Sequence, residues 1–574
     1  MALLEEKRRA LREGLAAAYA AAQSAGMIPP APLPAFSLEA PGPGGQGDLA
    51  CNLALVVGAA ARRPPRAVAE ALVAHLSFAA IPDLAAIEVA GPGFLNVRFR
   101  EGWLAPVVAE VLAAGEAYGD CDLGGGRRVL VEFVSANPTG PLNVVNCRAA
   151  AFGDSLVRCL RAAGYQAEAE YYVNDAGGQF RRLGQSLEAR LRELQGETGA
   201  ATTIPEGGYP GDYLLAVARD YRAAHGVTIL GAPAAERVEA LARYAVTAML
   251  REQFATLHRF GVDYDHVTHE SDIRAARAPE QALEALCAAR APDGQPYVYA
   301  RDGALWLRST AFGDNDDRVV RKSDGEFTYR LPDIAYHAAK FARGFDLLID
   351  LLGQDHHGDV PGVRAGLQIL GQPVERLEVL ITQLVRLVRA DGQVERVSKR
   401  GGSFVTMDAF LDEVGADAAR YFFLMHTLET HMDFDVELAQ RRSQDNPVYY
   451  VQYAHARIAS ILRQAAEQGL AVPDAASCDA GLAGLLRHPA EKAVLQKLAQ
   501  FPDEVAAVAA GRAPHRLTVY ARQLAEVFHA FYVECRVLGE VPDLTAARLA
   551  LCGGTRLVLA RTLRLLGVSA PDRM

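Results

Sequence analysis

The stretch 128–173 restricts the fold more than any other part of this chain. It contains a short apolar run at 128–134, a loop at 137–141 (NPTGP), a helical pattern to about residue 164, and a second apolar run at 168–173. Strand, loop, helix and strand in this order begin a parallel βαβ sheet, in which ligands bind beyond the carboxyl ends of the strands. We therefore expect an α/β, Rossmann-type domain with a site after residue 134.

The remaining periodicity predicts two further domains. A strand at 345–352 and a helix at 360–370 continue the α/β alternation, whereas from about residue 445 only 3.6-residue periodicity remains. Before the sheet, 1–25, 49–61 and 65–76 are helical patterns, and 87–100 alternates like a strand after a break at 91–93. We expect a small α+β domain at 1–118, a catalytic domain at 119–444 and an all-α domain at 445–574.

Composition excludes several classes of protein. The 59 Lys and Arg against 69 Asp and Glu give a net charge of -10, unlike a protein that coats nucleic acid. Any RNA contact must then use local basic patches. The eight cysteines form no Cys-x-x-Cys pair, so neither structural zinc nor a disulfide framework is expected. A charged, amphipathic start and the lack of a long apolar run favour a cytoplasmic protein without a membrane span.

Two segments resemble a known family. Residues 131–142 (VEFVSANPTGPL) and 171–179 (YYVNDAGGQ) resemble the bacterial arginyl-tRNA synthetases, which are class I aminoacyl-tRNA synthetases, and the likeness extends from about residue 47 to residue 574. The resemblance implies a class I Rossmann-type fold and an arginine–tRNA ligase that uses ATP with Mg²⁺. The implied partners are arginine and tRNA(Arg), and we expect a monomer.

The resemblance assigns an arginine site. Glu132 and Asn137 lie in the first signature, and Tyr329 and Asp333 lie in 329–337 (YRLPDIAYH), which is similar to the family's substrate segment. A guanidinium stays charged and demands a carboxylate partner when buried. In isolation, Asp333 after a proline could equally cap a helix.

The segment 353–358 (GQDHHG) follows a predicted buried strand. Its position at a carboxyl end predicts that Gln354 contacts arginine and that His356 and His357 serve the nucleotide pocket. No further ligand stands at metal spacing, so we expect no metal site here.

The first ATP signature departs from the family. Asn143-Val144-Val145-Asn146 stands where the resemblance places His-x-Gly-His. By resemblance, Pro141, Asn143, Val145 and Asn146 bind ATP, and Asn143 and Asn146 take the catalytic positions. An amide still donates hydrogen bonds but is neutral, and Val145 adds bulk where a bare backbone is expected. The helix start also offers N–H groups to phosphate. We expect slow activation.

The second ATP signature is 396–402 (RVSKRGG), which resembles the class I Lys-Met-Ser-Lys-Ser loop. It implies that Ser398 and Lys399 bind ATP and that Lys399 is catalytic, offsetting charge on the leaving pyrophosphate. In isolation, a short basic run is more often a solvated loop.

The helical domain carries a candidate RNA face. Tyr450, Tyr453 and Arg457 fall on one helical face within a segment similar to the family's anticodon helix. Aromatic rings with an arginine stack on unpaired bases, although such a stripe could also be core. By resemblance, Tyr532 and the terminal Met574 join this surface. The five arginines from residue 548 onward, against one acid, predict the required basic patch.

The N-terminal segment 91–96 (GPGFLN) resembles the family's tRNA-elbow module, which implies that Phe94 and Asn96 contact the D-loop.

Two hypotheses compete with a working ligase. The altered ATP signatures could mark a paralogue that binds tRNA or arginine without efficient charging. A Rossmann ligase outside translation would leave the anticodon-like domain unexplained.

Overall fold

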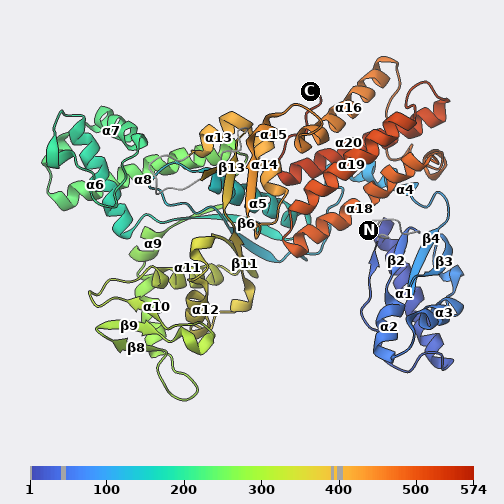
Figure 1. Cartoon of the computed structure of the whole chain (residues 1–574), viewed down its shortest axis with the longest axis horizontal. Coiled ribbons are helices and arrows are strands. Elements are labelled where there is room, and N and C mark those ends of the chain that lie inside the picture. The colour runs from blue at the N-terminus through green and yellow to red at the C-terminus, as the bar shows by residue number, and fades with distance from the viewer. Residues whose placement is uncertain (1–2, 40–46, 390–393, 397–404) are drawn as a thin grey trace.

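The computed structural model describes residues 3–39, 47–389, 394–396 and 405–574. It shows an elongated molecule in which an N-terminal module lies beside a long arm of helices, with two further lobes at the other end (Figure 1). Within the described ranges, no helix is long and apolar enough to cross a membrane.

The N-terminal module packs helices on an antiparallel sheet of order β1-β2-β4-β3. Its elements are α1 (Leu3–Ser24), β1 (Leu38–Glu39), β2 (Leu49–Cys51), α2 (Leu53–Ala61), α3 (Pro65–Ala74), η1 (Phe78–Ala80), β3 (Leu84–Ala90) and β4 (Phe94–Phe99). The predicted helix at 49–61 is wrong at its start, because 49–51 pair with β4 as an inner strand. Local periodicity does not show such a pairing.

The centre is a parallel sheet of order β12-β11-β5-β6-β7. Its strands are β5 (Arg128–Glu132), β6 (Gln166–Val173), β7 (His266–His269), β11 (Leu347–Gly353) and β12 (Leu377–Thr382). The crossover helix α5 (Val144–Ala162) joins β5 to β6, and α11 (Arg330–Ala342) and α12 (Val360–Ile369) flank β11. The predicted α/β domain is therefore confirmed.

Two lobes are inserted between strands of the parallel sheet. The first consists of α6 (Gly177–Glu193), η3 (Gly199–Thr202), α7 (Asp212–His225), η4 (Thr228–Gly231) and α8 (Ala234–Arg259). The second consists of α9 (Glu270–Ala275), α10 (Ala278–Ala288), β8 (Val298–Arg301), β9 (Ala304–Leu307), η5 (Ser309–Phe312) and β10 (Arg318–Arg321).

A smaller sheet, of order β14-β13-β15, connects the parallel sheet to the arm. This region contains β13 (Val385–Val388), β14 (Val394–Arg396), α13 (Met407–Val414), α14 (Ala416–Leu424), β15 (Met432–Asp435) and α15 (Val436–Gln440). In the parallel sheet, η6 (Gln354–His356) follows β11 and η7 (Val374–Arg376) precedes β12.

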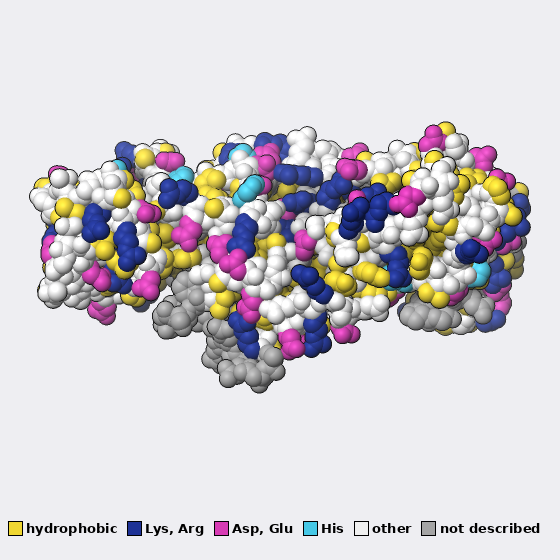
Figure 2. Space-filling view, turned by 90° about the horizontal axis from the view of Figure 1, so that it is seen from above, with side chains coloured by type: hydrophobic (Ala, Val, Ile, Leu, Met, Phe, Trp, Pro, Cys, Tyr) yellow, Lys and Arg dark blue, Asp and Glu magenta, His cyan; other side chains and the backbone are white. Residues whose placement is uncertain are grey.

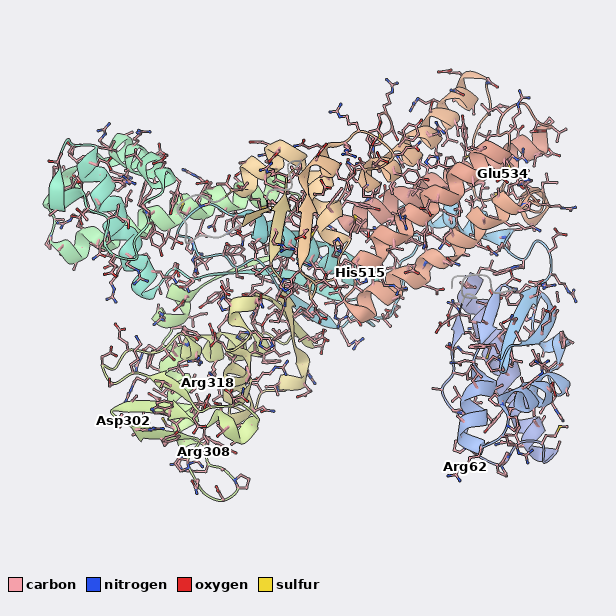
Figure 3. All side chains as sticks on the ribbon, in the orientation of Figure 1. Arg62, Asp302, Arg308, Arg318, His515 and Glu534 are labelled. Atoms are coloured by element: carbon pink, nitrogen blue, oxygen red, sulfur yellow. The ribbon has the colours of Figure 1, made fainter. Side chains whose placement is uncertain are left out.

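The regular elements of the C-terminal arm between residues 447 and 566 are all helices, as predicted. It consists of α16 (Pro447–Glu467), α17 (Ala480–Ala483), α18 (Pro489–Gly511), α19 (His515–Glu534) and α20 (Pro542–Leu566), with α4 (Pro106–Ala114) and η2 (Gly115–Ala117) packed against α20. His515 and Glu534 mark the two ends of α19 (Figure 3). One hydrophobic core runs from the parallel sheet into these helices, so arm and sheet are continuous.

Candidate functional site

Three acidic side chains stand in one row across the parallel sheet. The strand register pairs Asp350 of β11 with Glu132 of β5, and Glu132 with Glu170 of β6. Residues paired in register point to the same face of a sheet. Their exposed fractions are 2, 7 and 0%, respectively. Because buried carboxylates are costly unless they are paired, the row requires cations nearby.

Helix α11 supplies those cations at intervals of three residues. Lys340 donates to Glu132 at 2.5 Å and to Asp350 at 2.7 Å, and Arg343 donates to Glu170 at 2.7 Å. Burial alone would lower the pKa of Lys340, but the carboxylates of Asp350 and Glu132 raise it above its ordinary value. Lys340 is therefore charged in this setting.

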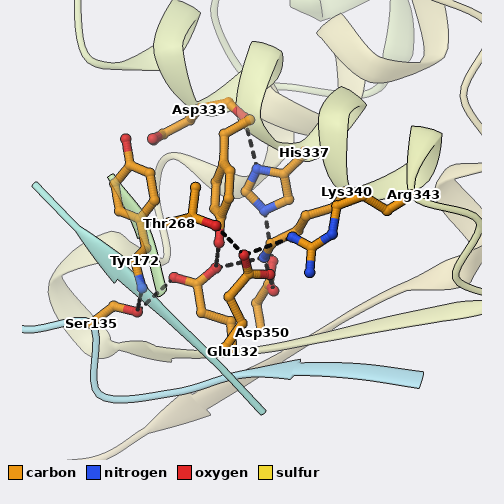
Figure 4. Close-up of polar contacts among 11 residues, drawn as sticks. Glu132, Ser135, Tyr172, Thr268, Asp333, His337, Lys340, Arg343 and Asp350 are labelled. Carbon is orange, nitrogen blue, oxygen red and sulfur yellow. Dashed lines mark hydrogen bonds and ion pairs between the residues drawn. The ribbon is translucent and has the colours of Figure 1, made fainter. Parts of the chain in front are cut away.

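His337 is the third cation of this helix face. Its Nε2 lies 2.7 Å from Asp350, and its Nδ1 lies 2.7 Å from the backbone carbonyl of Asp333 (Figure 4). A carbonyl and an ionised carboxylate can only accept, so both ring nitrogens must donate. Burial would lower the pKa of His337, yet the Asp350 carboxylate raises it. Burial likewise opposes ionisation of Asp350, but Lys340 and His337 lower its pKa.

Asp333, one turn before His337, is the carboxyl of this region without a cation. No described side chain donates to its carboxyl oxygens, and the side chain is partly exposed. Burial of the carboxyl raises the pKa of Asp333 to about 7, against a smaller opposing effect of His337, and the nearby Glu270 raises it further. The group thus favours a cation from outside the chain.

Sequence reasoning missed two neighbours of Asp333. Glu270 begins α9 directly after β7, is buried, and pairs with Arg274 at 2.5 Å. Its place after a parallel strand was the signal that could have found it. The buried hydroxyl of Tyr172 has no partner in the described structure and points toward Asp333 (Figure 4). Burial raises its pKa, with Glu270 and Asp333 adding to the shift.

The other residues predicted for arginine are spread along the carboxyl edge of the sheet. Tyr329 is 53% exposed and donates from its hydroxyl to Asp359 at 2.5 Å. Gln354 is exposed in the turn that follows β11, and Asn137 is partly exposed in the loop after β5. Asp333 lies on α11, and Glu132 of β5 bonds Lys340 of the same helix. Tyr329 and Gln354 are exposed at the rim of this site.

The turn after β5 is strained. Val134 and Ser135 both have positive φ, 69° and 37°, a region that side chains rarely adopt. The Ser135 hydroxyl donates to Glu132 at 2.8 Å and accepts from the Tyr172 N–H at 3.0 Å. The strain therefore positions a hydroxyl that fixes the Glu132 carboxylate.

Asn143 and Asn146 form a capping box at the start of α5. The Asn143 side chain accepts from the N–H groups of Val145 and Asn146, at 3.1 and 3.3 Å, and the Asn146 side chain accepts from the Asn143 N–H at 2.9 Å. Two N–H groups that the sequence analysis offered to phosphate are thus already bonded. What remains for a ligand is the amide nitrogen of each side chain. Pro141 is buried, and Val145 is only partly exposed.

Residues Thr406 and Met407, which follow the second ATP signature, lie beside this box. Ser398 and Lys399 lie outside the described residues, but the chain that follows them forms an antiparallel bridge between Thr406 and Asn143. The Met407 N–H also donates to the Leu142 carbonyl at 2.8 Å. His356 and His357 are exposed at the end of β11. Across the described ranges, no cluster of three or more His, Cys, Asp or Glu could hold a metal ion.

An aromatic and cationic face lies between α16 and α19. The Arg457 guanidinium carbon stands 4.8 Å from the ring centres of both Tyr453 and Tyr532, and the Tyr450 ring centre lies 5.0 Å from that of His529. The predicted set from α16 thus meets Tyr532 of α19. Burial, with the nearby Arg457, lowers the pKa of His529 to about 4, so this ring is neutral near pH 7.

Comparison with known proteins decides the family. The model described as the arginyl tRNA synthetase N terminal domain matches residues 9–99, and the DALR anticodon binding domain matches 451–574. The arginine–tRNA ligase of Symbiobacterium thermophilum is 45% identical over 574 residues, covering 100% of both chains. That of Moorella thermoacetica is 46% identical over 574 residues, again 100% of both. The chain belongs to the arginyl-tRNA synthetases.

The structure agrees with this family. The arginyl-tRNA synthetase of Thermus thermophilus superposes with a TM-score of 0.75 at 25% identity, over 99% of this chain and 100% of that chain. In the present chain, the parallel sheet, the N-terminal module and the helical arm are those that the resemblance implied. The aromatic face of α16 and α19 lies almost wholly within the segment that the anticodon-domain model matches.

The sequence predicted a basic patch from the five arginines that follow residue 547. This prediction is wrong for four of them. They pair with carboxylates that are distant in sequence or in the C-terminal tail: Arg548 with Glu491, Arg556 with Asp572, Arg561 with Asp120, and Arg564 with Glu116. Met574 is 52% exposed beyond them. Seen from above, Lys and Arg side chains are spread along the length of the molecule (Figure 2).

The N-terminal module presents the predicted pair on one face. Phe94 and Asn96 alternate with buried residues along β4, and Phe94 is exposed. Gly93, with φ of 140°, lets the turn before β4 approach Pro65 so closely that a side chain would collide with it. The turn therefore fixes where the strand and its exposed ring begin.

Proposed function

We propose that this chain is an arginine–tRNA ligase: it activates arginine with ATP and transfers it to tRNA(Arg). The single observation that carries the proposal is Asp333, a carboxyl with a pKa raised to about 7 by burial and without a cation among the described side chains. Inserting a guanidinium would ionise this acid and form a bidentate pair. Membership of the arginyl-tRNA synthetase family supports arginine as the source of that guanidinium. The aromatic face of α16 and α19 supports tRNA as the acceptor.

In the arginine site, Asp333 takes the guanidinium, with Glu270 as a second acid and Tyr329 at the rim. Glu132, held by Ser135 and Lys340, receives the α-ammonium together with Asn137 and Gln354. These roles place the arginine carboxylate beyond β5, beside the start of α5. The site thus orients the nucleophile, and no residue of the chain needs to form a covalent bond.

In the ATP site, Pro141, Asn143, Val145, Asn146 and His356 line the nucleotide. The arginine carboxylate attacks the α-phosphate, and pyrophosphate leaves. The amide nitrogens of Asn143 and Asn146 donate to the phosphates while the side-chain oxygens hold the helix cap. Ser398 and Lys399 precede Thr406, which forms a bridge with Asn143, and Lys399 offsets the charge of pyrophosphate.

Mg²⁺ would accompany ATP. The capping box contributes amides rather than carboxylates, so this donor set fits an ion held by the phosphates and water, which is how Mg²⁺ commonly binds nucleotides. When bound, the ion neutralises phosphate charge.

The tRNA-binding residues belong to two domains. Tyr450, Tyr453, Arg457 and Tyr532, with the terminal Met574, receive the anticodon loop, while Phe94 and Asn96 receive the D-loop. The working domain boundaries are 1–118, 119–444 and 445–574. We place the protein in the cytoplasm as a monomer.

The test is charging of tRNA with labelled arginine. The purified chain should form arginyl-tRNA in the presence of ATP, and Asp333→Ala should not. Asp302→Asn, in the outer lobe of β8 and β9 (Figure 3), should charge like the parent. If the parent binds tRNA and arginine but forms no arginyl-tRNA, the result would contradict the proposal and favour a non-catalytic paralogue.

A further inference from the structure

The acid row and the face of α11 form a balanced set of buried charges. Three carboxylates from neighbouring strands meet three cations at positions 337, 340 and 343 of one helix. Figure 4 shows the contacts converging between strands and helix. With both nitrogens of His337 facing acceptors, the formal charges of the set sum to zero. The chain thus neutralises the row without a ligand.

Lys340 is central to this balance. It is 1% exposed and bonds two of the three acids, Glu132 and Asp350. Its ammonium also lies 4.5 Å from the ring centre of Tyr336, whose hydroxyl donates to Glu132 at 2.8 Å. The hydrogen bonds of the Lys340 ammonium are therefore to the acid row, one of them to Glu132 of the proposed arginine site. No step of the proposed reaction uses this ammonium.

The balance matters because arginine is not simply a cation. It has two positive groups and one carboxylate, and that carboxylate must approach the sheet edge to react. An uncompensated row of acids would repel the carboxylate of arginine. It would therefore favour the decarboxylated amine, which has the guanidinium but no carboxylate. At the low effective dielectric of a buried site, one unpaired charge has a strong effect on such a choice.

Resting on the proposed function, we propose that Lys340 is a specificity-determining positioning residue. By cancelling one charge of the acid row, it makes the site accept the carboxylate-bearing amino acid over its decarboxylated amine. Asp333 remains the acid that attracts the guanidinium, and Lys340 sets the net charge that the remainder of the ligand meets.

The test compares arginine with agmatine, which keeps the guanidinium but has no carboxylate. Calorimetry gives the ratio of the agmatine to the arginine dissociation constant for the full chain. In Lys340→Met the ratio should fall about tenfold at pH 8, because one carboxylate is uncompensated. It should fall less at pH 6, where a carboxyl takes up a proton and restores the balance. The groups facing position 340 are Glu132, Asp350, Glu170, Tyr336 and His337.

Two variants keep the test sharp. Glu170→Gln removes an acid and leaves Lys340 and the permanently charged Arg343 in place, so its ratio should move the opposite way, toward arginine. It provides the answer even if Lys340→Met does not fold. Lys7→Met is the matched control, because Lys7 is buried and paired with Asp83 at 2.6 Å in the N-terminal module. It should lower stability and leave the ratio unchanged.

The outcomes separate the two proposals. A parent that binds arginine, with Lys340→Met and Glu170→Gln both keeping the parental ratio at each pH, would overturn the role of Lys340 alone. A parent that binds neither ligand would overturn the arginine site and this inference with it.

Discussion

The backbone N–H of Met407 donates to the carbonyl of Leu142 at 2.8 Å, which joins the exit of the second ATP signature to the entrance of the first. These residues are more than 260 positions apart in the chain. The contact places Met407 immediately beside the capping box of α5. Variants of this box should consequently affect both ATP signatures.

Asn143 combines two roles that substitutions can separate. Asn143→Asp keeps an N-cap acceptor but removes the amide donor and adds charge near the phosphates, so ATP–pyrophosphate exchange should fall about 10²-fold or more with thermal stability retained. Asn143→Ala should lose exchange and also about 1 kcal/mol of stability. Exchange assays and thermal melts measure the two effects. Full exchange in Asn143→Asp would refute the donor role.

Restoring the family's box tests whether it limits the rate. Asn143→His, Val145→Gly and Asn146→His together should raise tRNA-dependent exchange above that of the parent, because imidazoles replace weaker donors and bulk is removed near adenine. A parent already as fast as its relatives would show that Val145 does not obstruct the nucleotide. If the parent and the triple variant both bind tRNA tightly but show no ATP–pyrophosphate exchange, the result would favour the non-catalytic alternative.

Asp333 makes arginine binding depend on pH. Because its pKa is raised to about 7 and a guanidinium favours the ionised form, affinity should rise between pH 6 and pH 8 and then level off. Binding should release protons, which calorimetry in buffers of different ionisation enthalpy detects. For stability the sign is opposite: the contribution of Asp333 is full below its unfolded pKa and is lost as pH rises through 7. Asp333→Asn should flatten both profiles.

The same pocket should distinguish arginine from lysine. A planar guanidinium can bond Asp333 through two N–H groups at once, whereas an ammonium cannot reproduce that geometry. Calorimetry with each amino acid should show clear binding of arginine only, and Asp333→Ala should lose it. Equal affinity for lysine would remove Asp333 from the guanidinium site.

Tyr453 should contribute one base stack to tRNA binding. Tyr453→Ala should weaken tRNA binding by about 1–3 kcal/mol without changing ATP affinity, since the ring belongs to the helical arm and contacts none of the described residues proposed to bind ATP. Tyr165→Ala is a matched control, because Arg127 contacts that ring in the same way, at 5.0 Å, on the catalytic domain. Filter binding with tRNA measures both. Equal losses in the two variants would mean that the effect is not specific to this face.

The sequence by itself determined the local elements and the spacing within them. Two apolar runs and a helical pattern between them predicted β5, α5 and β6. Helical spacing placed Tyr450, Tyr453 and Arg457 on one face, because these properties depend on neighbours a few residues apart. It also identified Glu132 and Asp333 as acids of interest. Their different environments were not visible in it.

Only the tertiary structure decided how those acids are used. Glu132, Glu170 and Asp350 become neighbours through the order of the parallel strands, and three side chains of α11 neutralise them only because that helix lies across the row. The basic patch was wrongly predicted for four of the five C-terminal arginines for the same reason, since most of their acidic partners are distant in the chain. Sequence spacing shows which charges exist, but burial and long-range register determine which remain for a ligand.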